Sequence, residues 1–173
     1  MARKNRKPTK PHSDRILRKA SDYLEFDIHS FAAAIALYSA KRGTETGNAA
    51  LDSLLVRARV LIDFFMTTKR RSSDVIALDY FHDFKPKPYK PMMPRPVRRE
   101  REKVNKRLMH LTTKPMPRLR SNQSYNLETL ARPIVAAFRD WLAVVPDARL
   151  QKPATKVRAD YDKHLRRIEQ YLP

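Results

Sequence analysis

Apolar residues recur every three to four positions over long stretches of this chain, which is the period of one face of an α-helix. Within residues 14–42 the recurring apolar residues are Leu24, Ile28, Phe31, Ile35 and Tyr38. Only two glycines occur among 173 residues, and almost no run alternates strictly between apolar and polar residues as a half-buried strand does. The sequence therefore predicts an all-α fold.

The strongest periodicity predicts a long antiparallel helix pair. The first helix begins near residues 13–14 and ends near Gly43, either continuous or broken near Ser21. The second begins around residues 46–48 and continues to about residue 67. Because the turn between them is short, the two helices should pack against each other as a hairpin.

Three further helices are predicted, so we expect a helical bundle of four to five helices built on this pair. One begins near Pro96 and stops before Pro115, the next spans about 127–145, and the last spans about 154–171. A chain of this length supports one core of ordinary size. We therefore expect a single helical domain over residues 14–173.

A Pro-rich connector at 85–96 separates the helix pair from the later helices. Five prolines in this segment exclude a regular helix and favour an extended, polyproline-like backbone. A short helix from Ser73 to about Tyr80 is predicted before it. Four aromatic residues in this region are expected to pack on the core, namely Tyr80, Phe81, Phe84 and Tyr89.

The net charge of +19 is concentrated in two blocks. Residues 1–19 hold eight Lys and Arg against one acidic residue, and residues 69–120 hold sixteen against five. Because residues 1–13 have no apolar residue after Ala2, we expect a disordered basic arm there. A positive field of this size attracts polyanions, so nucleic acid is the expected partner.

Several classes of protein are not supported by the composition. The chain has no cysteine, and no Gly-rich phosphate-binding loop can be built from its two glycines. No apolar run approaches the roughly 18 to 20 residues of a membrane span, and the N-terminus lacks the apolar stretch of a secretory signal. We expect no cofactor, no metal, no membrane association and a cytoplasmic location.

Two small clusters of charged residues have structural interpretations. Arg59 and Asp63 lie four residues apart beside the apolar face of the second helix, so we predict that they pair across one turn. Asp79, His82 and Asp83 have a ligand-like spacing. That spacing is weak support for a metal site, because a loop that solvates its charges has the same pattern.

The stretch NKRLMHLT, residues 105–112, contains the one histidine with a cationic setting that suggests chemistry. An imidazole that titrates near neutral pH can accept the proton of a ribose 2′-hydroxyl while a neighbouring cation stabilises the charge on phosphorus. His110 is therefore a candidate general base for RNA cleavage without a metal. The alternative is a solvated histidine on a basic helix.

A helix pair carrying LLVRARVLIDFF, followed by DVIALDYF and NKRLMHLT, resembles bacterial helical proteins of the HEPN (higher eukaryotes and prokaryotes nucleotide-binding) superfamily over about residues 20–113. The resemblance implies a metal-independent endoribonuclease, often a toxin or defence protein, that acts as a homodimer. The motif of that superfamily is Arg, four to six residues, then His, and His110 matches its histidine. At the three positions open to its arginine this chain has Lys103, Val104 and Asn105.

From these observations we predict a HEPN-like helical protein that binds nucleic acid, RNA more than DNA, without catalysis. Alternatives are an endoribonuclease that uses His110 with Asn105 and Arg107, and a toxin–antitoxin type partner that binds an acidic protein. The residues predicted to contact nucleic acid are all cations, namely Arg3, Lys4, Arg6, Lys7, Lys69, Arg70, Arg71, Arg98, Arg99, Lys103 and Lys106.

Overall fold

The chain is an all-α bundle. The computed structural model describes residues 11–68, 74–113 and 125–153, and beyond these 155–157, 159, 160, 166, 168 and 170; the side chains of residues 107–113 are outside the description. The described elements are α1 (Asp14–Ala40), α2 (Glu45–Met66), the 3-10 helix η1 (Ala77–Phe81), α3 (Arg95–Thr113), α4 (Leu127–Val144) and the 3-10 helix η2 (Asp147–Arg149).

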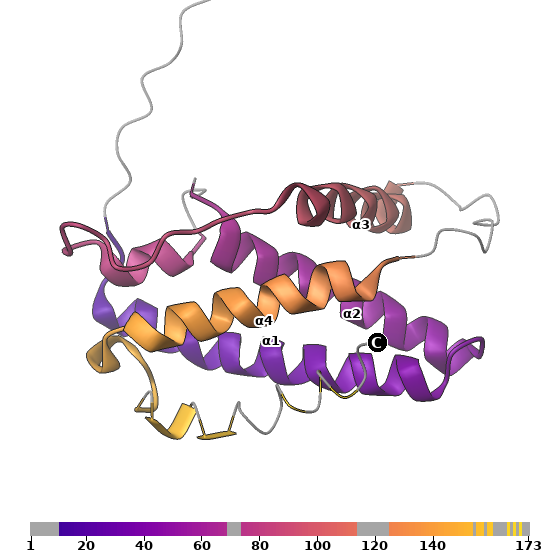
Figure 1. Ribbon diagram of the computed structural model, residues 1–173, viewed down its shortest axis with the longest axis horizontal. Coiled ribbons are helices and arrows are strands. Elements are labelled where there is room, and N and C mark those ends of the chain that lie inside the picture. Colours follow the sequence, from indigo (N-terminus) through magenta and orange to yellow (C-terminus); the bar gives the residue numbers. More distant parts are fainter. Residues whose placement is uncertain are drawn as a thin grey trace, which may run out of the picture.

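Helices α1 and α2 form the predicted antiparallel hairpin along the length of the bundle (Figure 1). α1 is continuous through Ser21, so the alternative of a break there is wrong. α2 begins at Glu45, slightly earlier than predicted, because Thr44 caps it: the Thr44 hydroxyl accepts a hydrogen bond from the backbone N–H of Gly47 at 3.1 Å.

The turn between these helices depends on Gly43 and on Gly47 in the first turn of α2. Gly43 has a φ of +84°, a left-handed conformation that costs a residue with a Cβ atom but not glycine. A Cβ atom at Gly47 would lie 2.0 Å from the carbonyl oxygen of Lys41. The turn can therefore reverse the chain tightly only because both side chains are absent.

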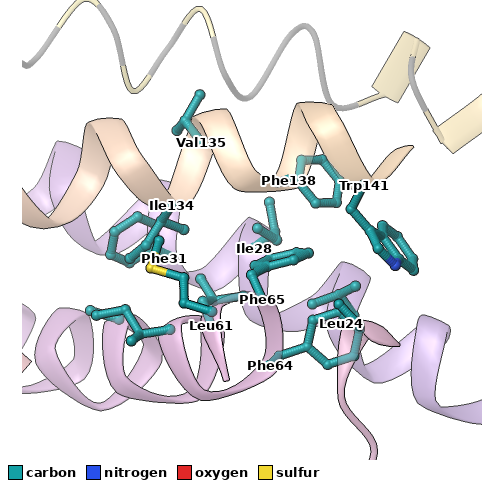
Figure 2. Packing of buried hydrophobic residues seen from close by; sticks show 14 of the residues in the cluster. Leu24, Ile28, Phe31, Leu61, Phe64, Phe65, Ile134, Val135, Phe138 and Trp141 are labelled. Atoms are coloured by element: carbon teal, nitrogen blue, oxygen red, sulfur yellow. The ribbon is translucent and has the colours of Figure 1, made fainter. Parts of the chain in front are cut away.

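The core centres on aromatic side chains of α2 and α4 (Figure 2). The rings of Phe64 and Trp141 meet edge to face with centroids 5.7 Å apart, and those of Phe65 and Phe138 do the same at 5.7 Å. This is the favoured geometry of aromatic pairs. Leu24, a residue of the predicted apolar stripe of α1, is buried at the same core.

The segment between α2 and α3 packs on the core as predicted, with one exception. The Tyr80 hydroxyl donates to the carbonyl of Leu17 at 2.7 Å, and the Tyr89 hydroxyl donates to the carbonyl of Phe65 at 3.0 Å. Phe81 is buried, whereas Phe84 keeps 39% of its surface exposed. The predicted helix over about residues 73–80 does not form in its described part: residues 74–76 have no helical structure, and the 3-10 helix η1 begins at Ala77.

The later helices follow the prediction closely. α3 begins at Arg95, one residue before Pro96, and α4 spans Leu127–Val144 with Asn126 as its cap. Both pack on α2 and on each other. The described positions between 155 and 170 are helical, and two of them, Val157 and Ile168, are buried.

Arg149 joins three segments that are far apart in the sequence. Its guanidinium donates to both carboxylate oxygens of Asp83 at 2.7 Å, to Asp14 in the first turn of α1 at 3.0 Å, and to the carbonyl of Tyr80. Only 7% of Arg149 is exposed. A buried guanidinium is tolerated because four oxygens satisfy it, so this cluster fixes η1 and η2 against the start of α1.

We predict that Phe65→Ala lowers the free energy of unfolding by about 3 to 5 kcal/mol, because Phe65 is fully buried among aromatic rings. Phe26→Ala is the matched control. Phe26 is 57% exposed, so its loss should cost less than about 1 kcal/mol. Urea denaturation measures both values, and equal losses would contradict the assigned core.

The Arg149 guanidinium, which donates to Asp83, lowers the pKa of that carboxyl from 3.8 to about 2. A carboxyl with a lowered pKa in the folded state stabilises the fold above its unfolded pKa and loses this contribution as the pH falls. We predict that Asp83→Asn destabilises the protein near neutral pH and that this difference vanishes as the pH falls from about 4 to about 2. Urea denaturation across this range checks it; a constant difference would contradict it.

Candidate nucleic-acid interface

One side of α3 is a basic surface. Figure 1 shows α3 along one edge of the bundle, with an extended segment leading into it. At 100° per residue, the exposed charged residues of its described part fall within an arc of about 140°. They are five cations and one acid, namely Arg95, Arg98, Arg99, Glu102, Lys103 and Lys106. We call these six residues the α3 basic face.

The opposite side of α3 holds the helix on the bundle. Val97 and Val104 are buried there, and the register places them about 180° from the middle of the α3 basic face. Glu100 is buried on the same inner side and accepts a hydrogen bond from Lys103 Nζ at 2.6 Å. The apolar contacts therefore decide which way the cations of α3 point.

Further cations lie in the segment that leads into α3. Lys85, Lys87 and Lys90 are exposed and alternate with Pro86 and Pro88, while the neighbouring Tyr89 is buried. Burial of Tyr89 attaches this extended segment to the core. The lysines therefore extend the positive surface from the start of α3 along a fixed backbone.

The structure describes some of the predicted contact residues and not others. It brings Arg98, Arg99, Lys103 and Lys106 together on the α3 basic face, and Lys103 is paired with Glu100. Arg3, Lys4, Arg6, Lys7, Lys69, Arg70 and Arg71 lie outside the described residues. His110 and Arg107 stand within α3, but their side chains are also outside the description.

The HEPN-like motif would place its arginine at residue 103, 104 or 105, and the residues found at these positions have other roles. Lys103 is bonded to Glu100, and Val104 is 1% exposed and packs in the core. Asn105 is partly buried, and its Oδ1 has no hydrogen-bond partner among the described residues. None of the three presents a guanidinium that could grip a phosphate with two hydrogen bonds.

The predicted Arg59–Asp63 pair forms, with a second arginine added. Arg59 Nε lies 4.0 Å from Asp63 Oδ2 across one turn of α2. Arg101 of α3 donates through Nε to Asp63 Oδ1 at 2.8 Å, so the carboxylate is shared between two helices. This ion pair fixes the position of α3 beside α2 at the edge of the basic surface.

These charges line a groove with a volume of about 510 Å³ between α2, Arg101 and residues 74–76. Its remaining lining is mostly apolar and includes Val56, Val60 and Phe64. Neither the groove nor the roles of Arg95 and Arg101 were predicted. Arg95 stands beside Pro96, where the helix was predicted to begin, and this position could have indicated that Arg95 is exposed. The groove could not be predicted, because it depends on packing between distant segments.

The residues with ligand-like spacing, Asp79, His82 and Asp83, make structural contacts. Asp79 Oδ2 accepts from the backbone N–H of Ile76 at 2.9 Å, and His82 Nδ1 lies 3.0 Å from the carbonyl of Asp79. Asp83 binds Arg149 with both oxygens. Within the described ranges, no group of three or more His, Asp or Glu side chains is placed to hold a metal ion.

Comparison of the chain with protein-family models, with curated proteins and with solved structures gave no match. The resemblance to HEPN-like proteins therefore stays a prediction. Among the helices that the structure describes, none is both long and apolar enough to cross a membrane.

We predict a coupling of about 0.5 to 1 kcal/mol between Asp63 and Arg101, because both side chains are partly exposed and water screens their attraction. Urea denaturation of Asp63→Asn, Arg101→Gln and the double variant gives this value as a double-mutant cycle. Additive losses would mean that the ion pair does not hold α3 against α2.

Proposed function

We propose that this protein binds nucleic acid, without catalysing its cleavage, through the α3 basic face and the exposed lysines that precede it. The observation that carries the proposal is the separation of charge from apolar residues on α3. Five cations share one exposed side of the helix, while Val97 and Val104 occupy the other side. Such a row of cations suits the regularly spaced phosphates of a nucleic-acid backbone.

Few acidic side chains neutralise this surface. Among the described residues, Arg95, Arg98, Arg99 and Lys106 make no ion pair, and Lys103 alone pairs with a carboxylate of α3. Mutual repulsion among the cations destabilises the free protein, and phosphates that replace the counterions relieve it. Because such contacts read the backbone rather than the bases, we expect affinity with little dependence on sequence.

The absence of catalysis is proposed from the motif positions. Lys103 is engaged with Glu100, Val104 is in the core and Asn105 is uncharged, so an arginine partner for His110 is missing at each position that the HEPN-like motif allows. The preference for RNA over DNA rests on the resemblance to that superfamily alone.

We predict that reversing three cations of the α3 basic face, in Arg95→Glu, Arg99→Glu and Lys106→Glu together, weakens binding to a single-stranded RNA by at least about tenfold at low salt. The slope of log affinity against log salt should fall by about 2, since each lost phosphate contact removes roughly 0.7 on single strands. Fluorescence anisotropy over a series of salt concentrations measures both quantities.

The matched control reverses three exposed cations elsewhere, in Arg15→Glu, Lys41→Glu and Arg42→Glu together. Both triple variants change the net charge equally, so the control separates a local surface from the overall field. An equal loss of affinity in the two variants would contradict a site on α3. Affinity of the native protein that does not change with salt would contradict phosphate binding altogether.

A further inference from the structure

The groove includes Arg101, which lies about 60° around α3 from Arg98 of the α3 basic face, and its lining differs from that face. Val56 and Val60 form part of it, and each keeps 41% of its surface exposed. Val75, Ile76 and Phe64 add to the same apolar lining. Apolar side chains that open to solvent beside a row of cations are unexplained by phosphate binding, and they suggest a ligand that is partly charged and partly apolar.

The polar part of the groove contains both signs of charge. Arg59 and Arg101 stand beside Asp63, and Asp74 lies on the rim. Because two carboxylates accompany the two guanidinium groups, an anion alone gains little there. A bound group must also bury the apolar lining to be held.

From these features we propose that the groove takes one unpaired base of a single-stranded nucleic acid, with a neighbouring phosphate on Arg59 and Arg101. The proposal rests on the function proposed above and names the strand type and the position of a base. A volume of about 510 Å³ is within the range of small-ligand sites, which is about 300 to 1,000 Å³. A base in a duplex is stacked and paired, so only a single strand can supply one.

The arrangement of α3 supports this position. Arg98, Arg101 and Asn105 lie on successive turns of one side of the helix, since the register places Arg98 and Asn105 about 60° and 40° from Arg101. Arg98 belongs to the α3 basic face, so a strand held there can extend to Arg101.

Asp63 has a defined part in this arrangement. It holds the Arg101 guanidinium through Nε and Nη2, and the Nη1 group of Arg101 can donate to a phosphate. Arg59 is 4.0 Å from the same carboxylate and is free to shift toward a phosphate within that distance. The ion pair therefore sets one guanidinium in place before the strand binds.

The test compares an oligonucleotide that carries bases with one of the same length whose sugars are abasic, which keeps the phosphates. We expect the native protein to bind the first about tenfold more tightly. Val60→Tyr should fill the groove and remove this difference, so that the two strands bind with equal affinity. The control is Val144→Tyr on α4, a valine of similar exposure outside the groove, which should behave as the native protein.

The outcomes separate the two proposals. Equal affinity of the native protein for both strands, with a steep salt dependence, would overturn the groove proposal and leave phosphate binding intact. A preference for bases that survives Val60→Tyr would also overturn it. Binding of neither strand would contradict the proposed function itself.

A second readout does not depend on a variant. Methyl NMR signals of Val56, Val60, Val75 and Ile76 should shift more when the native protein binds the base-containing strand than when it binds the abasic strand. Equal shifts with both strands would overturn the groove proposal.

Discussion

The arrangement of the bundle is constrained by α2, which is buried on several sides. Its apolar residues cover too wide an arc for one partner, so α1, α3 and α4 all pack against it. Phe64 and Phe65 then reach the rings of Trp141 and Phe138 on α4. Because the bundle is built around one helix, the positions of the other helices are set by what they bury against α2.

This constraint also explains where the positive charge lies. α3 has little apolar surface, and in its described part Val97 and Val104 bury the apolar side while Arg101 joins Asp63 of α2. The cations of the helix have no place in the core, since burying an unpaired charge is costly. They therefore collect on the outer side as the α3 basic face, next to a groove that the same packing creates.

Sequence periodicity was sufficient for the helices and not for the contacts between distant segments. The apolar stripes of α1, α2 and α4 predicted their extents to within a few residues, because a helix depends on local spacing. Arg149 was not among the residues singled out from the sequence, yet it is buried and bound to Asp14 and Asp83, which are 135 and 66 residues away. Phe84 was expected in the core but is partly exposed. The presence of an aromatic residue in a loop does not indicate whether its side chain faces the core or the solvent.

The candidate site shows the same contrast between features set by local helical spacing and features set by contacts between distant segments. The predicted cations Arg98, Arg99, Lys103 and Lys106 do share one side of α3, since that follows from helical register. The pairing of Lys103 with Glu100, the sharing of Asp63 by two arginines and the apolar groove required the packed structure. Sequence could predict the polarity of a helix but not the shape of the surface beside it.

We proposed that nucleic acid binds along α3, and backbone amide NMR during titration with a single-stranded RNA locates the binding surface. We expect the largest shifts on residues of the α3 basic face and on Lys85, Lys87 and Lys90. Shifts confined to α1, with the amides of α3 unchanged at saturation, would contradict it.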